Sequence, residues 1–372
     1  MIIMALDHTR DFFHSTAMTA DPLDPTTTTA ALFFTRWITH FCAPTFVLLS
    51  GLSAYLSSQQ KTKIEASGFL IKRGIWLLFV EVAIVTLGLT FNPGYNFIIL
   101  QVIWAIGWSM IILGLLIRSS YKTVLVIGLL LTLAHNAMDY ATIPPKSLAG
   151  ILSTILLTSR GAVFPLGANH LVGAFYAILP WTGIMLMGYC MGPWFKPDFS
   201  AERRKRLLIA LGSGLILLFI VLRLSRGYGD PEAWKPGEHW LYSFLDTSKY
   251  PPSLQYCGMT LGPTLLLLAF TENVRSGWSR VVSVYGRVPF FYYILHFYLL
   301  HTLLVIVFFA TGHSAQQVAD PGSPFAFRPV NFGFSLLIVY VIWLSAVATL
   351  YLPCRWFNNY KLQHRQWWLK YI

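Results

Sequence analysis

Charged residues are scarce in this chain of 372 residues, because Asp, Glu, Lys and Arg together make up only 11% of it. Soluble globular proteins carry about a quarter charged residues, so this composition excludes a protein that is surrounded by water on all sides. Hydrophobic residues make up 55%, and the mean hydropathy is +0.58. The composition therefore predicts an all-α fold, a polytopic transmembrane helix bundle.

Cysteine is also scarce, with four residues that are far apart and form no Cys-x-x-Cys motif. This spacing argues against a disulfide framework and against a structural metal site, and we expect no metal. The motifs of common soluble enzymes are missing as well: the chain has no Walker motif, no His-Glu-x-x-His and no Gly-x-Ser-x-Gly. The sequence thus points away from the familiar soluble chemistries.

A membrane span needs about 20 apolar residues. Nine segments meet this requirement: 32–57, 69–91, 97–118, 121–138, 171–192, 205–224, 257–272, 288–310 and 331–353. The chain also begins with a short apolar stretch that meets Asp7 and His8 after six residues. We interpret it as the outer half of a first span whose inner half is missing. The prediction is a single domain over 1–372 with about ten helices, the first one truncated in this chain.

Basic residues outnumber acidic ones by 27 to 15, which gives a formal net charge of +12. Eighteen of the Lys and Arg residues fall in five segments that alternate with the predicted spans: 58–73, 118–122, 193–206, 273–287 and 354–372. Because Lys and Arg concentrate in cytoplasmic loops, we place these five segments and the C-terminus on the cytoplasmic side. The intervening segments would then lie on the outer side.

A polar motif near the start of the chain reads Asp7-His8-Thr9-Arg10-Asp11 and is followed by His14. On a helix, Asp7 and Asp11 are four residues apart and flank the face of His8. A carboxylate next to an imidazole can fix its tautomer and raise its basicity, which makes a general base. The alternative is a helix end whose polar side chains only meet lipid headgroups, and the spacing alone favours neither. We name His8, Asp7, Asp11, His14 and Arg10 as candidate catalytic residues.

Further polar residues lie near the predicted outer ends of other spans, namely Arg36, His40, His135, Asn136, Asp139 and His170. A polar layer at one depth of an apolar bundle is the usual form of a membrane site. We therefore add His40 to the candidate catalytic residues and assign Arg36, Asn136, Asp139 and His170 to acceptor binding. Glu81 is the only acid deep inside a full span. We favour for it a structural pair with Arg10, Arg36 or a histidine, which could still orient the acceptor.

A second group of candidates lies at the predicted cytoplasmic side. Arg suits bidentate contacts with phosphate, and Lys72, Arg73, Arg280 and Arg287 fall at one predicted level. The positive-inside rule by itself explains any one of them, but as a set they could hold the phosphates of a nucleotide. Tyr292 and His296, four residues apart on the next span, complete this candidate cofactor site.

Several stretches of the chain together resemble a known family. They are ALDHTRDFF, ALFFTRWITHFCAPTFVLLSGLSAYL, VIWAIGWSMI, RGYGDPEAW, KYPPSLQYCGMTLGPTLLLL and GRVPFFYYILH. They are similar to a large bacterial membrane family that carries the heparan-alpha-glucosaminide N-acetyltransferase catalytic domain. The resemblance covers nearly the whole chain. It implies membership of the transmembrane acyltransferase superfamily and a location in the bacterial inner (cytoplasmic) membrane.

The resemblance also implies an activity. Enzymes of this superfamily take an acyl group, here acetyl from acetyl-CoA, at the cytoplasmic face and pass it to a sugar or glycan on the other face. Their first span carries an Arg-Gly pair with a functional His or Asn eleven residues after the Arg, and His8 matches that functional position. The Arg-Gly pair would fall before Met1, so we expect either a start assigned too late or a truncated chain. His14 is the nearest counterpart of a second histidine in the heparan enzyme.

Two other functions remain open at this stage. A proton-coupled transporter or flippase could use the same His and Asp residues to relay protons, and a membrane scaffold would leave the histidines unexplained. We rank the acyltransferase first and the transporter second. As partners we expect membrane lipids and a sugar or glycan acceptor but no nucleic acid, and a homodimer is compatible with the sequence.

Overall fold

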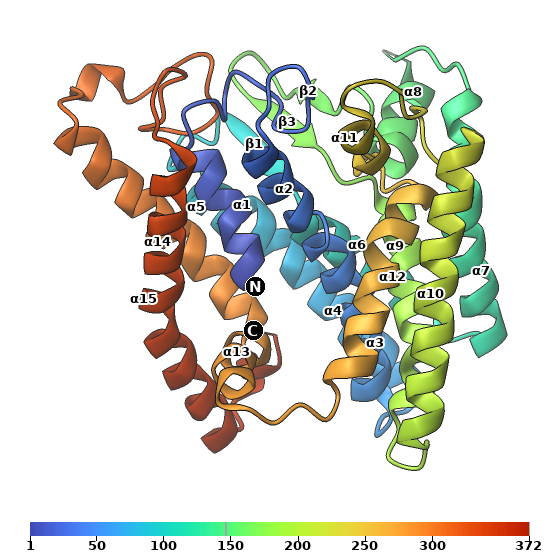
Figure 1. Ribbon diagram of the computed structural model, residues 1–372. Coiled ribbons are helices and arrows are strands. Elements are labelled where there is room, and N and C mark those ends of the chain that lie inside the picture. Colours follow the sequence, from blue (N-terminus) through green and yellow to red (C-terminus); the bar gives the residue numbers. More distant parts are fainter. Residues whose placement is uncertain (146, 372) are drawn as a thin grey trace. The chain divides into compact units, whose positions relative to one another are not determined.

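The structure is a computed structural model that describes residues 1–145 and 147–371, and it confirms the all-α, polytopic class (Figure 1). In this part of the chain, six helical runs are long and apolar enough to cross a membrane: Ala30–Ser58, Tyr121–Tyr140, Ala201–Ser225, Leu254–Thr271, Pro289–Ala310 and Leu336–Gln363. Each of them overlaps a span that the sequence predicts.

The described chain divides into two compact units. Unit 1 consists of Met1–Cys42, Val82–Phe97 and Val274–Ile372, and unit 2 consists of Ala43–Glu81 and Ile98–Asn273. Both units are therefore assembled from segments that are distant in sequence. The single domain over 1–372 stays a prediction.

Unit 1 contains the helices α1 (Ile2–Phe13), α2 (Ala30–Thr39), α5 (Thr86–Thr90), α13 (Gly277–Arg287), α14 (Pro289–Ala310) and α15 (Leu336–Gln363). Helix α1 packs against α2, α14 and α15, and α14 and α15 lie next to each other (Figure 1). The indole of Trp343 donates a hydrogen bond to the carbonyl of Ile2 at 2.8 Å, and the backbone N–H of Phe334 donates to that of Phe13 at 2.7 Å. Helix α1 is therefore fixed at both of its ends.

Unit 2 is the larger unit. Its helices are α3 (Cys42–Ser58), α4 (Lys63–Val80), α6 (Val102–Leu116), α7 (Tyr121–Ala134), α8 (Leu148–Ser153), α9 (Ile178–Met191), α10 (Ala201–Ser225), α11 (Trp240–Leu245) and α12 (Leu254–Thr271). The pairs α4 with α6, α7 with α9 and α10 with α12 pack side by side. Small residues permit close helix contact within the unit: a side chain at Gly51 would collide with the backbone of Met185, and one at Gly188 with the backbone of Leu48.

Side chains that begin the helices explain several of their boundaries. Thr62 and Glu65 form a capping box at the start of α4, and Ser200 and Ser253 accept backbone N–H groups at the starts of α10 and α12. Pro289 occupies the first turn of α14, where the missing N–H of proline breaks no helical hydrogen bond. These boundaries are readable from local sequence.

Two predicted spans begin differently from the prediction. Residues 97–100 and 171–174, which we expected to be helical, form the strands β1 (Phe97–Leu100) and β3 (Leu171–Ala174). With β2 (Val163–Pro165) they make a sheet in the order β1-β3-β2, in which Val163 pairs with Gly173. The helices that follow, α6 and α9, are consequently only 15 and 14 residues long. A short apolar run reads alike as strand or helix, and here the strand partners decide.

The predicted span 32–57 is interrupted. Helix α2 ends at Thr39, and α3 begins at Cys42, so that the break falls at His40 and Phe41. Pro44 lies in the first turn of α3, where proline is well tolerated. At the C-terminus, α15 continues ten residues beyond the predicted end at 353 and has Pro353 in its interior.

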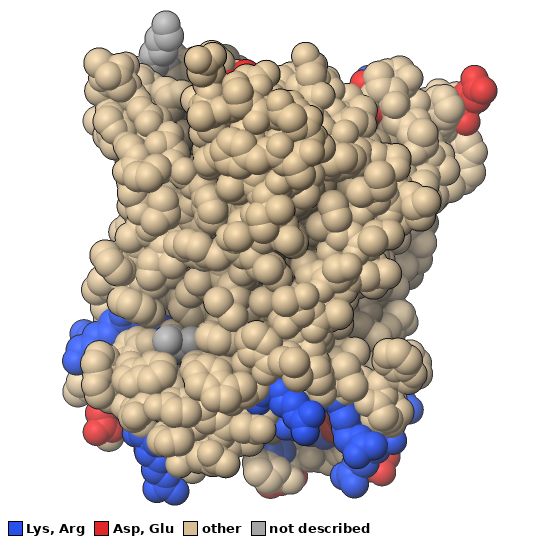
Figure 2. Space-filling model, turned by 90° about the vertical axis from the view of Figure 1, so that its left-hand side faces the viewer, with Lys and Arg blue, Asp and Glu red and all other residues tan. Residues whose placement is uncertain are grey.

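The surface of α15 supports a membrane location. Large apolar side chains on this helix are exposed, among them Leu337, Val341, Leu344, Leu352 and Trp356. Figure 2 faces the side on which α14 and α15 lie in Figure 1. It shows a broad area of uncharged residues, with Lys and Arg gathered toward one end of the view. An apolar surface of this kind is stable in lipid and unfavourable in water.

Candidate functional site

A cluster of four charged residues joins α1 to α2 in unit 1. Nη1 of Arg36 lies 2.7 and 2.5 Å from the two carboxylate oxygens of Asp7. Nη2 of Arg10 lies 2.6 Å from an oxygen of Asp11 and 3.4 Å from one of Asp7. Asp7 and Arg10 are buried, with 8% and 5% of their surfaces exposed. The sequence placed all four at a site, and the structure brings them into contact.

His8 extends from this cluster toward α14. Its Nδ1 lies 3.6 Å from a carboxylate oxygen of Asp11. On the other side, its ring centroid is 5.3 Å from that of His296 and 4.5 Å from that of Phe297. The contact between Nδ1 and Asp11 is slightly longer than a hydrogen bond, and a small movement of the side chains would let Asp11 accept a hydrogen bond from Nδ1 and leave Nε2 to accept a proton. A carboxylate in this position suits a general base.

Tyr292 and His296 occupy one face of α14, and neither is exposed to solvent. Their rings are nearly parallel, with centroids 5.8 Å apart. The hydroxyl of Tyr292 and Nε2 of His296 are both buried and find no hydrogen-bond partner among the described residues. Leaving a buried polar atom without a partner costs about 1–3 kcal/mol. The sequence assigned both residues to the cofactor site, and in unit 1 His296 is adjacent to His8.

His14 is held by hydrogen bonds to neighbouring segments. Its Nδ1 accepts hydrogen bonds from the hydroxyl and the backbone N–H of Thr16, at 3.0 and 3.4 Å. Its carbonyl accepts a hydrogen bond from Arg328 at 2.7 Å. Burial, together with the positive charges of Arg10 and Arg328, lowers the pKa of His14 below its usual value. These contacts suit a neutral imidazole that closes the turn after α1, while the candidate catalytic role of His14 stays a prediction.

His40 and Glu81 are both deeply buried, with 1% and 0% of their surfaces exposed. His40 follows the last residue of α2, and its backbone N–H bonds to the carbonyl of Trp37 at 3.1 Å. The carboxylate of Glu81, in unit 2, accepts the backbone N–H of Gln101 at the start of α6. We expected a charged partner for Glu81 in Arg10, Arg36 or a histidine. In the contact that is observed, the carboxylate accepts a hydrogen bond at the N-terminus of α6, where a negative charge stabilises the helix.

Asn136 and Asp139 have structural contacts in unit 2. The side chain of Asn136 accepts the backbone N–H of Leu254 at 2.9 Å and donates to Asp139 at 2.7 Å. Asp139 also pairs with Arg160 at 2.8 Å. His170 lies in the partly exposed turn between β2 and β3, where its carbonyl accepts the N–H of Leu166. Their predicted role in acceptor binding stays a prediction.

The four basic residues predicted to hold a phosphate belong to different units. Arg280 and Arg287 are exposed on α13 of unit 1, and Arg287 stands in the last turn of that helix, directly before α14. Lys72 is exposed and Arg73 half-buried on α4 of unit 2. Arg280 and Arg287 thus belong to the helix that precedes the one carrying Tyr292, while a joint site of all four residues stays a prediction.

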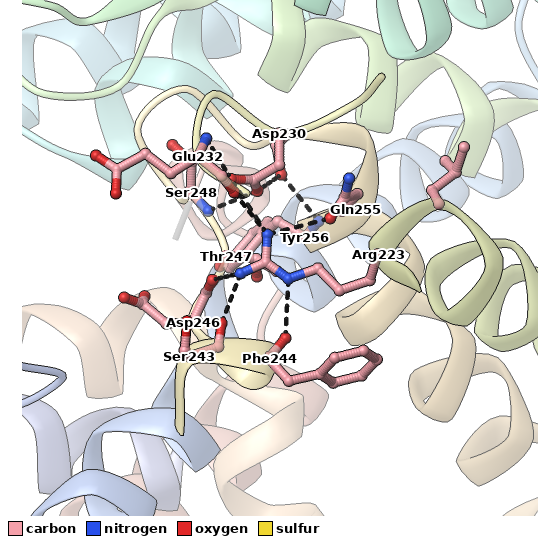
Figure 3. A network of polar contacts seen from close by, with 12 residues as sticks. Arg223, Asp230, Glu232, Ser243, Phe244, Asp246, Thr247, Ser248, Gln255 and Tyr256 are labelled. Atoms are coloured by element: carbon pink, nitrogen blue, oxygen red, sulfur yellow. Dashed lines mark hydrogen bonds and ion pairs between the residues drawn. The ribbon is translucent and has the colours of Figure 1, made fainter. Parts of the chain in front are cut away.

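One buried arginine was missed by the sequence reasoning. The guanidinium of Arg223, at the end of α10, donates to the carbonyls of Glu232, Ser243, Phe244 and Asp246 and to the side chain of Gln255 (Figure 3). Only 2% of Arg223 is exposed. The residue holds the segment that joins α10 to α12. A charged residue in the last turn of an apolar helix was the available signal.

Arg328 is a second missed arginine, and it is fully buried in unit 1. It donates to the carbonyls of Pro329 and His14 and thereby fastens the segment between α14 and α15 to the end of α1. Burial lowers its pKa to about 10, against the opposite effect of Asp11. The sequence offered little sign of this role, because Arg328 lies in a polar connecting segment far from α1 along the chain.

The chemical capacity of unit 1 follows from these contacts. His8 lies beside the carboxylate of Asp11 on one side and beside the buried ring of His296 on the other, and the ring of Tyr292 stacks on that of His296. Arg36 and Arg10 neutralise the carboxylates that hold this arrangement. Such a constellation can take a proton from a hydroxyl or amine and can stabilise charge on a second group.

Comparison with known proteins identifies the family of this chain. The family model described as "Heparan-alpha-glucosaminide N-acetyltransferase, catalytic" matches residues 2–222, which is more than half of the chain. The matched region contains α1 and α2, and with them His8 and the four-residue charged cluster, whereas α14 lies beyond it. No curated protein matches the chain, and no solved structure matches it.

Proposed function

Since the chain belongs to the heparan-alpha-glucosaminide N-acetyltransferase catalytic family, a family of membrane acetyltransferases, we propose that it transfers an acetyl group from acetyl-CoA to a sugar or glycan acceptor across a membrane. Acetyl-CoA is the donor that this family generally uses. We further propose that the donor binds on the side of the basic segments, which would be the cytoplasmic side, and that the acceptor binds on the other side.

The observation that carries this proposal is the environment of His8. The residue lies in the part of the chain that the family model matches, has a carboxylate oxygen of Asp11 at 3.6 Å from Nδ1, and packs against an apolar interior. A helix end that only meets lipid headgroups would not need the buried pair of Asp7 and Arg36. The charged cluster therefore favours a functional site over a solvated helix end.

The proposed reaction begins with His8. Nε2 of His8 accepts a proton from an amine or hydroxyl of the acceptor while the acceptor atom attacks the thioester carbonyl. The carbon–sulfur bond then breaks, the acetyl group stays on the acceptor, and the proton finally reaches the thiolate of coenzyme A. Asp11 keeps the proton of His8 on Nδ1, and Arg10 and Arg36 hold the two carboxylates in place.

The test uses the full chain in proteoliposomes with acetyl-CoA and two probes, methyl α-D-glucosaminide as an amine and methyl α-D-glucoside as a hydroxyl. The release of free coenzyme A thiol and the formation of acetylated sugar are measured together. His8→Ala should reduce kcat/KM by about 10²–10⁴, the usual contribution of a general base. His364→Ala, at an exposed site after α15, is the matched control and should leave the rate unchanged.

Two results would contradict the proposal. Equal rates for His8→Ala and the unmodified chain would remove His8 from the mechanism. Uptake of a labelled probe into the vesicles without any release of coenzyme A would instead support the proton-coupled transporter.

A further inference from the structure

The two unpartnered polar atoms on α14 call for an explanation. Among the residues that the structure describes, the hydroxyl of Tyr292 and Nε2 of His296 are buried without a hydrogen-bond partner. Folded proteins leave few such groups, and each one requires a reason. Here the two residues are one helical turn apart on the same face with their rings stacked, and the ring of His296 lies next to that of His8. The pattern suits two atoms that meet a ligand during function.

The contact of Nδ1 of His296 indicates which of its two ring nitrogens can accept a proton. Nδ1 of His296 lies 3.3 Å from the carbonyl of Tyr292, and a carbonyl only accepts, so Nδ1 carries the hydrogen. In the neutral ring Nε2 is then a proton acceptor. His296 can therefore take a proton from a protonated His8, whose ring centroid is 5.3 Å away.

Another histidine on the same helix provides a contrast. Both ring nitrogens of His301 lie near carbonyl oxygens, Nδ1 at 3.0 Å from that of Leu89 and Nε2 at 2.8 Å from that of Ala326. His301 is as deeply buried as His296. The two buried histidines of α14 therefore differ, because Nε2 of His301 lies near a carbonyl whereas Nε2 of His296 is without a partner among the described residues.

We propose that His296 carries the proton from His8 to the departing sulfur of coenzyme A, while the hydroxyl of Tyr292 donates a hydrogen bond to the carbonyl oxygen of the thioester. This inference rests on the proposed acetyltransferase function and adds two catalytic residues to it. Both lie beyond the region that the family model matches.

The proton balance explains why a relay is useful. The acceptor loses one proton to His8, and the thiolate that leaves needs one proton to become a neutral thiol. If acceptor and thiolate leave on opposite sides, the proton must cross the interior between them. His8 passes it to Nε2 of His296, and His296 passes it to sulfur, so both histidines return to their neutral state. No oxidant or further reactant is required.

Tyr292 has a different part in the same step. As the acceptor attacks, negative charge develops on the carbonyl oxygen of the thioester. A buried phenol hydroxyl without another partner can donate to that oxygen, and such donors act strongly in a site from which water is excluded. The residue therefore stabilises the carbonyl, and His296 serves the leaving group.

The experiment compares two acetyl donors with the full chain in proteoliposomes, with methyl α-D-glucosaminide and methyl α-D-glucoside as acceptors. Acetyl-CoA releases a thiolate that needs a proton, whereas S-(4-nitrophenyl) thioacetate releases one that is stable without it. His296→Gln should lose at least about 100-fold in kcat/KM with acetyl-CoA but less than about 10-fold with the activated donor. Tyr292→Phe should lose equally with both donors, and His364→Gln is the control expected to lose nothing.

Solvent isotope measurements provide an independent readout with acetyl-CoA alone. The rate is measured against the fraction of D2O in mixtures with H2O. Its dependence should correspond to two protons in transfer in the unmodified chain and to one in His296→Gln. Tyr292→Phe removes an oxygen that lacks a partner, so its melting temperature in detergent should equal that of the unmodified chain or exceed it. This variant keeps the inference testable even if His296→Gln fails to fold.

The possible failures are distinguishable. Absence of acetyl transfer by the unmodified chain, from both donors to both acceptors, contradicts the proposed function and the relay with it. If transfer occurs but His296→Gln loses equally with both donors, only the relay is wrong. A lowered melting temperature of Tyr292→Phe would show that its hydroxyl has a structural partner and would remove Tyr292 from the site.

Discussion

The contact between Arg36 and Asp7 gives a quantitative prediction. The surrounding cluster contains two arginines and two carboxylates, so its charges balance, and the side chains of Arg36 and Asp7 are only 16% and 11% exposed. Replacing Arg36 with Gln leaves one uncompensated buried negative charge, for which Arg10 at 3.4 Å from Asp7 is the remaining cation. Removing one member of a buried pair costs about 3–5 kcal/mol. We take about 3 kcal/mol for this partly exposed pair.

The two residues should not act additively. Asp7→Asn alone leaves an uncompensated positive charge and should also cost about 3 kcal/mol. The double variant removes both charges and should lose no more than either single variant, which corresponds to a coupling of about 3 kcal/mol. For a domain of 150–250 residues, 1 kcal/mol lowers the melting temperature by about 2–4 °C. We therefore expect a decrease of about 6–12 °C in each single variant.

A buried cysteine makes the measurement possible. Cys354 is fully buried on α15, which packs against α1, so a thiol-reactive fluorophore can label it only when this region opens. The assay uses detergent-solubilised protein in which Cys42, Cys190 and Cys257 are replaced with Ala. The control is Arg275→Gln, at an exposed position of the same unit. It should change the free energy of unfolding by less than about 0.5 kcal/mol, which corresponds to about 1–2 °C in melting temperature. Additive losses in the double variant would refute the reasoning.

Three further predictions concern individual contacts. The pKa of His14 is lowered in the folded protein, so its contribution to stability is present above the unfolded pKa of about 6.5 and is lost as the pH falls from there toward the folded pKa. His14→Asn should keep the hydrogen bond with Thr16 and reduce this loss of stability, which is measured as melting temperature against pH. An unchanged pH profile would contradict this. Asn136→Ala should cost about 1–3 kcal/mol, since it leaves a backbone N–H at the start of α12 without its acceptor, and thiol labelling of Cys257 on that helix should begin at lower temperature. Arg223→Lys should lower the free energy of unfolding by about 3–5 kcal/mol and speed proteolysis of residues 226–253. The reason is that the ammonium group of lysine cannot reproduce the planar guanidinium, whose N–H groups reach four carbonyls. Proteolysis at the unmodified rate would show that the guanidinium is dispensable.

The sequence by itself determined the class of the protein. A charged fraction of 11% and long apolar segments are properties of composition and order, and the helices overlap these segments because a bilayer demands internally bonded backbone. The motif from Asp7 to Asp11 was readable for a similar reason, since residues three or four apart on a helix are neighbours whatever surrounds them. Local spacing was therefore sufficient to find His8 and its carboxylate.

The partners from distant segments were decided only by the tertiary structure. Arg36 was assigned to the acceptor, which stays a prediction, and packing of α2 against α1 brings it into contact with Asp7. Glu81 was expected to pair with an arginine or histidine, and the contact that the structure shows is with a backbone N–H at the start of α6. The unsatisfied nitrogen of His296 and the five hydrogen bonds of Arg223 are likewise invisible in the sequence. Hydrogen bonds join atoms that are close in space, and an apolar chain carries few signals of which distant segments will meet.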